Sequence, residues 1–241
     1  ERVSYQRSDA VVLLSQDLRS NIAGKLNPKF HKRLHVIPNF VDTAAITPQS
    51  RMTRYRSELG IREELVVMYA GNVGFSQSLY LMIEAARKFP NVAFVINGDG
   101  AARKKLKEDA VGIPNVYFGE YQPIERLSEV LATGDIHVVP LHAGLASVSV
   151  PSKSYSILAA GRPMLAAIDA DTEIPQILLQ ARAGVSVRPD DLESFIAGLH
   201  SMIADPQSLE EMGINGRKWV EAHASPASVA EQYEAIFLAK R

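Results

Sequence analysis

The sequence predicts an α/β fold in which a doubly wound parallel sheet carries helices on both faces. Short apolar runs recur along the chain without polar alternation, which is the pattern of strands buried on both faces. Helical segments separate successive runs, so we expect parallel strands joined by right-handed crossovers. Loops rich in glycine follow several of the runs, at the edge where an open parallel sheet binds its ligands.

Two short strands and one helix are predicted before the regular pattern begins. The strands are expected at residues 10–14 and 34–37, and the helix between them at residues 16–26. Residues 43–52 follow without periodicity and are rich in Thr, Ala, Pro, Gln and Ser, which is typical of a linker. We therefore predict a domain boundary near residues 38–50.

The longer part of the chain then alternates between strands and helices. The strands are expected at residues 65–70, 92–96, 116–118, 136–140, 164–168 and 185–187. The helices are expected at residues 53–60, 79–88, 101–108, 123–133, within 150–163, and at 191–204, 207–222 and 225–240. This order predicts one large parallel sheet followed by a helical C-terminal segment.

Composition is that of an ordinary globular protein and excludes several classes. The hydrophobic share of 46% and the charged share of 22% are typical of a folded domain. A net charge of -1 gives no reason to expect a nucleic-acid partner. The absence of cysteine excludes disulfides and thiolate metal sites, and no apolar run is long enough to span a bilayer. Because the first residue is Glu1 rather than Met, we expect a piece of a longer protein.

Residues 150–163 carry the most specific pattern. Pro151 and Ser152 lead into an apolar helical run, and Ser152 is expected to cap the helix by accepting a backbone hydrogen bond. The N-terminus of a helix attracts anions, and Lys153 adds a full positive charge at the same end. The stretch therefore predicts a phosphate site, with a solvated lysine in an ordinary loop as the alternative.

Two glycine loops are further candidates for ligand binding. Gly71 and Gly74 follow the strand at residues 65–70 and would let the backbone approach a ligand without a Cβ in the way. The loop matches neither the dinucleotide fingerprint nor the Walker phosphate loop, and a tight turn is the alternative. Gly98-Asp99-Gly100 follows the next strand and is typical of a turn with a helix cap.

Other side chains give weaker signals. His142 lies in a loop and is more typical of a solvated residue than of a catalyst. No metal site is predicted from the six histidines. No Gly-x-Ser-x-Gly motif supports a hydrolase triad. Solvation explains the basic helix at residues 101–108, with attraction to a membrane surface as the alternative.

Taken together, these motifs resemble the C-terminal half of retaining GT-B-fold glycosyltransferases of the group 1 type (family 4), which include many bacterial polysaccharide and lipopolysaccharide transferases. The similar segments follow in family order at residues 9–15, 36–42, 98–100, 116–119, 151–153 and 158–163. The strongest similarity is Pro151-Ser152-Lys153, followed by Leu-Ala-Ala-Gly-Arg-Pro. The resemblance extends over nearly the whole chain and implies a GT-B-type, Rossmann-like sheet.

The resemblance also implies how the chain would bind a nucleotide-sugar donor. Gly119 and Tyr121 would lie near the base, and Lys153 would neutralise the diphosphate of the departing nucleotide. Ser156 would contact the ribose. The donor-binding residues implied in this way are Gly71, Asn72, Gly74, Gly98, Gly119, Tyr121, Pro151, Ser152, Lys153 and Ser156.

The sequence departs from the family pattern at the expected site. Val148 and Ser156 stand where the family often carries two glutamates, of which the second binds the ribose hydroxyls. The loop after the strand at residues 65–70 has Asn72 and Gln77 where the family usually offers an arginine and a lysine. Lys153 is therefore expected to carry more of the phosphate charge than usual, in a divergent subfamily or a weakened enzyme.

By the same resemblance, three parts of the chain have different roles. Residues 1–42 would be the end of the N-terminal, acceptor-side domain with its linker, and residues 43–224 the nucleotide-sugar-binding domain. Residues 225–241 would form a helix that crosses back to the N-terminal domain. The implied reaction moves a sugar from a UDP- or GDP-sugar to a glycan or lipid-linked acceptor, with retention, in surface polysaccharide biosynthesis.

No metal or other cofactor is implied, the catalytic groups stay unknown, and the chain alone is expected to be inactive. The expected location is the cytoplasm, and the resemblance admits peripheral contact of the full-length protein with the inner face of the plasma membrane. Two alternatives stay open: a non-catalytic nucleotide-sugar-binding or scaffold domain of the same fold, and a sugar-nucleotide epimerase.

Overall fold

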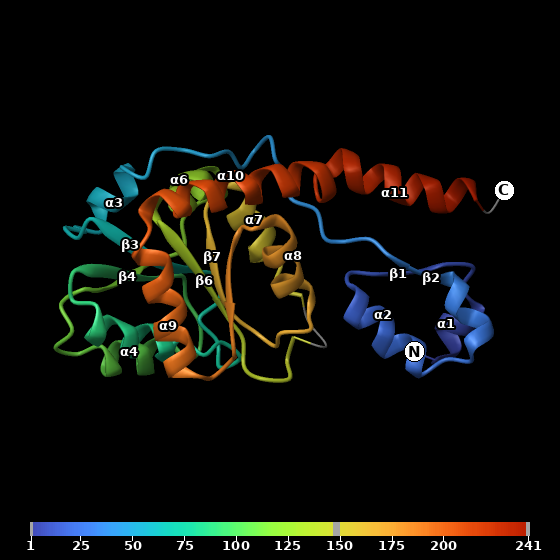
Figure 1. The fold of residues 1–241 in the computed structure, drawn as a ribbon, viewed down its shortest axis with the longest axis horizontal. Coiled ribbons are helices and arrows are strands. Elements are labelled where there is room, and N and C mark those ends of the chain that lie inside the picture. Colours follow the sequence, from blue (N-terminus) through green and yellow to red (C-terminus); the bar gives the residue numbers. More distant parts are fainter. Residues whose placement is uncertain (1, 147–149, 240–241) are drawn as a thin grey trace.

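The computed structural model describes residues 2–146 and 150–239, which form a small and a large unit (Figure 1). The small unit contains two parallel strands and the large unit contains six. An irregular segment, residues 37–52, leads from the small unit along the large one (Figure 1). None of the helices in these two ranges combines the length and the hydropathy required to cross a bilayer.

The small unit is built on β1 (Val11–Leu13) and β2 (Leu34–Val36). Around them lie α1 (Arg2–Arg7), α2 (Gln16–Gly24) and the 3₁₀ helix η1 (Pro28–Arg33). Ser15 begins α2, because its hydroxyl accepts a hydrogen bond of 3.3 Å from the backbone of Leu18. The two predicted strands and the helix between them are confirmed, whereas α1 and η1 were not predicted.

The large unit contains a six-stranded parallel sheet in the order β5-β4-β3-β6-β7-β8. The strands are β3 (Leu65–Ala70), β4 (Val92–Asn97), β5 (Val116–Gly119), β6 (Ile136–Pro140), β7 (Met164–Ala167) and β8 (Gly184–Val187). The chain first builds outward from β3 to β5 and then returns to the other side of β3, so the order switches between β3 and β6. The doubly wound parallel sheet predicted from the sequence is confirmed.

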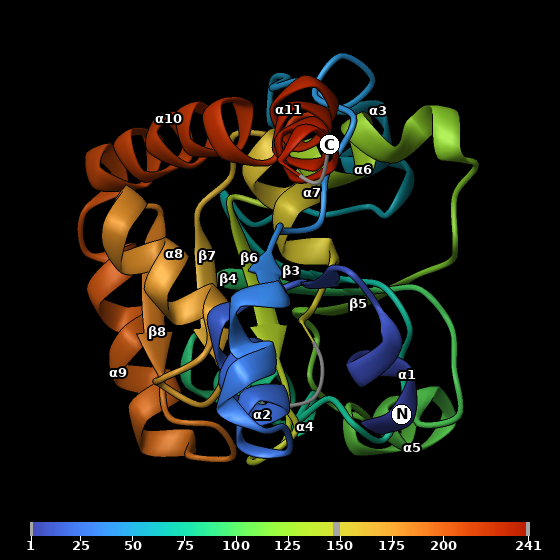
Figure 2. The same cartoon turned by 90° about the vertical axis from the view of Figure 1, so that its right-hand side faces the viewer.

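Helices cover both faces of this sheet (Figures 1 and 2). The helices of the chain after the small unit are α3 (Arg54–Glu58), α4 (Tyr80–Lys88), α5 (Arg103–Asp109), η2 (Ile124–Arg126), α6 (Leu127–Thr133), α7 (Lys153–Ala159), α8 (Glu173–Ala181), α9 (Leu192–Ile203), α10 (Pro206–His223) and α11 (Pro226–Leu238), and all but α11 lie against the large unit. The apolar residues of α4, α5 and α9 share one core cluster, and those of α7, α8 and α10 share another on the opposite face.

The central strand β3 explains why the sequence shows apolar runs rather than alternation. Val67 and Tyr69 belong to the core under α4 and α9, whereas Val66 and Met68 point to the opposite face. All four side chains are fully buried. Because successive side chains of a strand point to opposite faces, a strand covered on both sides needs no polar positions.

One helix of the large unit was not predicted. Helix α8 lies between β7 and β8 and packs on both, in a segment, residues 169–184, where no helix is expected from the sequence. Pro175 is its third residue, and proline weakens the sequence signal of a helix. In the first turn the missing N–H of proline costs no hydrogen bond, so the helix forms.

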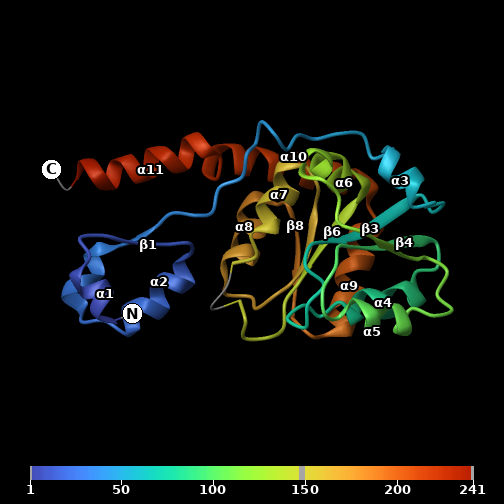
Figure 3. The ribbon, with the colours of Figure 1, turned by 180° about the vertical axis from the view of Figure 1, so that it is seen from behind.

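The last helix, α11, leaves the large unit. Ser225 begins it by accepting a hydrogen bond from the backbone of Ser228, and Pro226 occupies its first position. Seen from behind, α11 runs out from α10 on the side where the small unit lies (Figure 3). Its crossing to a further domain stays a prediction.

Candidate functional site

The candidate site lies at the carboxyl ends of β3, β4 and β5, beside the switch in strand order. A cavity of about 160 Å³ opens there between the strand ends and helix α7. Its polar lining consists of Gly71, Asn97, Tyr121, Gln122, Lys153 and Ser156. The structure thus brings together four members of the predicted donor-binding set, Gly71, Tyr121, Lys153 and Ser156, from distant parts of the sequence.

Lys153 supplies positive charge to this cavity. Its Nζ donates a hydrogen bond of 2.7 Å to the hydroxyl of Tyr69 and lies 4.0 Å from the centre of the Tyr69 ring. Burial lowers the pKa of Lys153 to about 8, and no carboxylate of the described residues offsets this effect. At neutral pH the ammonium is therefore protonated without a counter-ion, a state that an incoming anion would stabilise.

Gly71 and Gly74 shape the loop after β3. Gly71 has a φ of 144°, and a Cβ there would lie 3.1 Å from the Nζ of Lys153. Glycine at this position therefore leaves room for the ammonium group. The Gly71 N–H donates to the carbonyl of the last residue of β4, and the Gly74 N–H donates to the side-chain oxygen of Gln77. Both amides are engaged within the protein, whereas the side chain of Asn72 is exposed.

Gly98 and Gly119 act on the cavity through backbone packing. A Cβ at Gly98 would lie 2.0 Å from the carbonyl oxygen of Gly71, so only glycine lets the loops after β3 and β4 touch. A Cβ at Gly119 would lie 2.2 Å from the hydroxyl oxygen of Tyr55 and 2.5 Å from Oδ1 of Asn97. Neither glycine lines the cavity, and both hold its walls in place.

Asn97 and Gln122 line the cavity without having been predicted. Asn97 ends β4, is 4% exposed, and accepts a hydrogen bond from the hydroxyl of Tyr55. A polar side chain at the end of an otherwise apolar strand is the signal that would have identified it. Gln122 follows Tyr121, and its amide nitrogen lies 3.3 Å from the carbonyl oxygen of Glu120; no comparable sequence signal marks it.

The entry to α7 differs from the expectation. Ser152 has helical dihedral angles, with φ of -58° and ψ of -27°, and its side chain makes no capping bond, so the predicted cap is wrong. The reason is that the helical turn starts earlier, since the N–H of Ser154 already donates to the carbonyl of Pro151. Neither Pro151 nor Ser152 lines the cavity. Because α7 has only seven residues, we assign the main positive charge to Lys153 rather than to the helix dipole.

Ser156 lies one turn after Lys153 and lines the same cavity. By the resemblance expected from the sequence, its short hydroxyl would stand where the family often carries a glutamate. The second position of this kind, Val148, lies outside the described residues. The cavity therefore gains a small polar group from Ser156 without gaining a negative charge.

Asp190 ties the surrounding loops together. Its carboxylate accepts a 3.0 Å hydrogen bond from the N–H of Ala143, lies 2.7 Å from Nδ1 of His142 and accepts from the hydroxyl of Ser78. Burial opposes ionisation, but these hydrogen bonds outweigh it and hold the pKa of Asp190 below its usual range. His142 thus joins the loops after β6 and β8, which is a structural role.

Arg103 fixes the loop after β5. Its guanidinium donates to the carbonyl of Gly119 at 3.2 Å and pairs with Glu120 at 2.6 Å, and its side chain is 11% exposed. Lys104 and Lys105 on the same helix are exposed. The predicted basic helix therefore contains one anchoring arginine beside solvated lysines.

The chemistry available in the cavity is one ammonium together with amide and hydroxyl groups. Within residues 2–146 and 150–239, no three histidine or carboxylate side chains gather in a group that could hold a metal ion. An ammonium flanked by neutral hydrogen-bonding groups is suited to an anion that also carries hydroxyls. The exposed ring of Tyr121 adds a flat apolar surface at the edge.

Comparisons with known proteins agree with this fold. A sequence model of the family described as Glycosyl transferases group 1 matches residues 64–205. The chain is 32% identical over 148 residues to an Escherichia coli protein named as the colanic acid biosynthesis glycosyl transferase WcaI, covering 59% of this chain and 36% of that protein. It is 26% identical over 223 residues to the GDP-mannose-dependent alpha-(1-6)-phosphatidylinositol monomannoside mannosyltransferase of Mycolicibacterium smegmatis, covering 88% of this chain and 57% of that protein.

Among solved structures, Anabaena HepE in complex with UDP matches with a TM-score of 0.82 and 16% identity, covering 98% of this chain and 65% of that chain. At this identity the likeness shows the fold. The chain spans 36% and 57% of the length of the two curated relatives, so each of them contains a large part without a counterpart here.

Proposed function

This chain belongs to the glycosyl transferases group 1 family, and on that premise we propose that it forms the donor-binding half of a nucleotide-sugar-dependent glycosyltransferase. The family resemblance expected from the sequence is confirmed, and the fold is of the GT-B type. The proposed reaction moves a sugar from a UDP- or GDP-sugar to a glycan or lipid-linked acceptor, with retention, in surface polysaccharide biosynthesis.

One observation carries the proposal: a partly buried, protonated Lys153 without a counter-ion among the described residues lies beside Gly71 in a cavity at the switch in strand order. A sugar leaves a nucleotide donor together with a developing charge on the diphosphate, and a preorganised cation stabilises that charge. An anion stabilises the protonated form of such a lysine, because its negative charge replaces part of the solvation that burial removed.

The other lining groups suggest an orientation for the donor. We place the base near the loop after β5, against the exposed Tyr121 and the amide of Gln122, and the ribose near Ser156. The diphosphate would then reach Lys153 and the exposed Asn72. A volume of about 160 Å³ holds only part of a nucleotide, so the remainder would lie over the open edge of the site.

The names of the relatives support this choice without fixing it. The solved Anabaena protein is in complex with UDP, and the mycobacterial relative is named for GDP-mannose. We propose that the acceptor and the remaining catalytic groups belong to a part beyond this chain, and that the reaction takes place in the cytoplasm or at the inner face of the plasma membrane. The chain alone should then bind a donor and transfer nothing.

Calorimetry of this chain with UDP and with GDP tests the proposal. We expect one of the two to bind, and a Lys153→Ala variant to bind it about tenfold to a hundredfold more weakly, as for the loss of a hydrogen bond to a charged group. Lys88→Ala, at the exposed end of α4, is the matched control and should bind like the parent. Absence of binding by both nucleotides at millimolar concentration would refute the donor site, and equal affinity of the Lys153 variant would remove Lys153 from it.

A second candidate function rests on Ser156. A scaffold domain that retains the fold and has lost the chemistry fits a hydroxyl in the place of the family glutamate. The two functions differ in the full-length protein: the enzyme releases a nucleoside diphosphate in the presence of its acceptor, and the scaffold binds the nucleotide-sugar without turnover. Restoring the carboxylate with Ser156→Glu should raise donor affinity in either case if the ribose lies there.

A further inference from the structure

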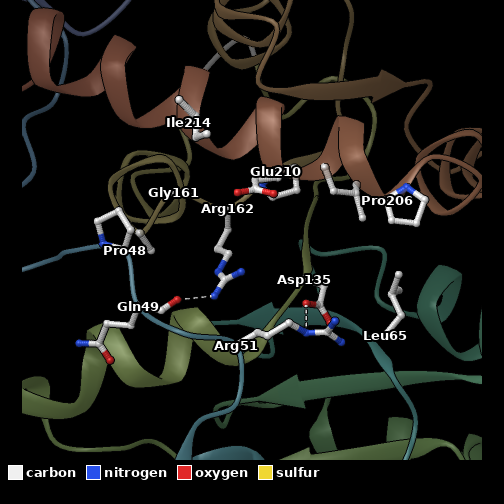
Figure 4. A pocket seen from close by; sticks show the side chains of 13 residues that line it. Pro48, Gln49, Arg51, Leu65, Asp135, Gly161, Arg162, Pro206, Glu210 and Ile214 are labelled. Carbon is white, nitrogen blue, oxygen red and sulfur yellow. Dashed lines mark hydrogen bonds and ion pairs between the residues drawn. The ribbon is translucent and has the colours of Figure 1, made fainter.

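A second and larger cavity lies at the opposite ends of the strands from the candidate donor site. It occupies about 430 Å³ at the amino ends of β3, β6 and β7, where Leu65, Asp135 and Pro163 stand. Helix α10 closes it on one side and the segment with Pro48 and Gln49 on another (Figure 4). The proposed donor function makes no use of this cavity.

Three arginines gather around a single carboxylate at its inner end. Asp135 binds Arg51 at 2.8 Å, lies 3.7 Å from Arg56, and accepts the N–H of Val66 at 2.8 Å. Arg56 in turn donates to the carbonyl of Glu64 at 2.7 Å. The carboxylate of Asp135 therefore pairs with Arg51 and Arg56, the first two of the three arginines.

The third guanidinium, of Arg162, has no carboxylate partner among the described residues. Its Nη2 donates to the carbonyl of Gln49 at 2.8 Å, and its Nε is buried without a partner. Figure 4 shows this side chain pointing into the cavity, apart from the Arg51–Asp135 pair. Burial lowers the pKa of Arg162, and the nearby charge of Asp135 offsets this effect only in part.

The position of Arg162 is set by close backbone packing. The preceding residue, Gly161, has a φ of 66°, and a Cβ on Gly213 of α10 would lie 2.1 Å from its carbonyl oxygen. Helix α10 thus rests directly on the turn that carries Arg162. A guanidinium held in this way is preorganised and loses little entropy when it binds a partner.

The rest of the lining is suited to the body of a small ligand. Leu65, Leu209 and Ile214 give it an apolar wall, while the exposed carboxylate of Glu210 stands at the mouth on α10. The volume falls within the usual range for small-molecule sites, and it exceeds what a bare phosphate ion requires.

We propose that this cavity binds a small phosphorylated metabolite, with its phosphate on Arg162 and the free edge of Arg51 and its body against α10. Planar guanidinium groups bind phosphate oxygens through paired hydrogen bonds, which a single lysine cannot reproduce. The ligand would occupy a site separate from that of the donor, because the two cavities lie at opposite ends of the strands.

Calorimetry of this chain with inorganic phosphate and with glucose 6-phosphate tests the proposal. We expect both to bind, and the sugar phosphate to bind more tightly because its body fills the cavity. Arg162→Gln should weaken binding by about tenfold or more, and Arg188→Gln, a largely exposed arginine far along the chain, should leave it unchanged. Binding of neither anion at millimolar concentration, or equal affinity for both, would overturn the assignment.

A second pair of variants separates binding from folding and from the donor site. Ile214 is 46% exposed, so Ile214→Glu should fold and repel the phosphate while leaving both arginines in place. Glucose 6-phosphate affinity that survives Ile214→Glu would contradict the site. Lys153→Ala should still bind glucose 6-phosphate. Loss of this binding in Lys153→Ala would show that the anion binds in the donor cavity and would contradict the proposal. Failure of UDP and GDP to bind would refute the donor site alone and leave this proposal standing.

Discussion

The free energy of unfolding of this chain should decrease as the pH rises, because Glu173 ionises in a partly buried position. Glu173 begins α8 in the large unit and faces the start of α2 in the small unit, near the backbone of Gln16 and the carboxylate of Asp17. Burial, together with the nearby charge of Asp17, raises the pKa of Glu173 from 4.5 to about 7. One oxygen of Asp17 is itself buried without a hydrogen-bond partner.

The size and the sign of the effect follow from linkage. A carboxyl group whose pKa is higher in the folded state binds more protons when folded, so the free energy of unfolding falls as the pH rises from about 4.5 to about 7. A pKa rise from 4.5 to about 7 corresponds to a ceiling of about 3 kcal/mol, and partial exposure to solvent reduces the expected value to about 1–2 kcal/mol. Above about pH 8 the loss is complete and constant.

Glu173→Gln removes this ionisation while keeping the shape of the protonated side chain. We expect the variant to match the parent below pH 4.5 and to exceed its free energy of unfolding by about 1–2 kcal/mol at pH 8. Urea denaturation at half-unit intervals from pH 4.5 to pH 8 measures the difference. Glu193→Gln, at the exposed first turn of α9, is the matched control. Parallel curves for the parent and Glu173→Gln across this range would refute the reasoning.

Three further predictions concern the candidate donor site. Because the pKa of Lys153 is about 8, affinity for a nucleoside diphosphate should fall between pH 7 and pH 9, and calorimetry should find this slope absent in Lys153→Ala. Gly98→Ala places a Cβ 2.0 Å from the carbonyl oxygen of Gly71, so we expect the free energy of unfolding to fall by about 2–4 kcal/mol. Thermal denaturation measures this change, and an unchanged melting temperature would contradict the packing. Tyr121→Ala should cost about 1–3 kcal/mol of nucleotide affinity if a base stacks there, while Tyr121→Phe should cost little, and equal effects of the two would exclude stacking.

The fold was predictable because its signals are local. Runs such as residues 65–70 are apolar on both faces, and this property alone identifies a strand covered by helices on both sides. Helix α8 escaped prediction because Pro175 obscures its first turn, and a proline there is tolerated for a reason that only the hydrogen-bond pattern shows. The fold class therefore follows from the pattern of apolar residues, whereas a single helix such as α8 can depart from the usual residue preferences.

The site was predictable only in part because its decisive contacts are long-range. The sequence places Lys153 near a helix start, but the missing counter-ion and the ring of Tyr69 under its ammonium follow from tertiary packing. Ser152 illustrates the opposite error, since a good capping residue does not cap when the helical turn begins before it. Asn97 could have been identified as the polar end of an apolar strand.

The strand order also governs how the chain can fold. Strand β3 pairs with β4 along one edge and with β6 along the other, where Val67 lies opposite Ile136. Until Ile136 has been synthesised, β3 presents an unpaired apolar edge, which is the template on which chains aggregate. A fragment that ends before β6 should therefore precipitate, whereas the complete sheet closes this edge with its later half. Folding of this domain depends on a pairing that nascent chains reach late.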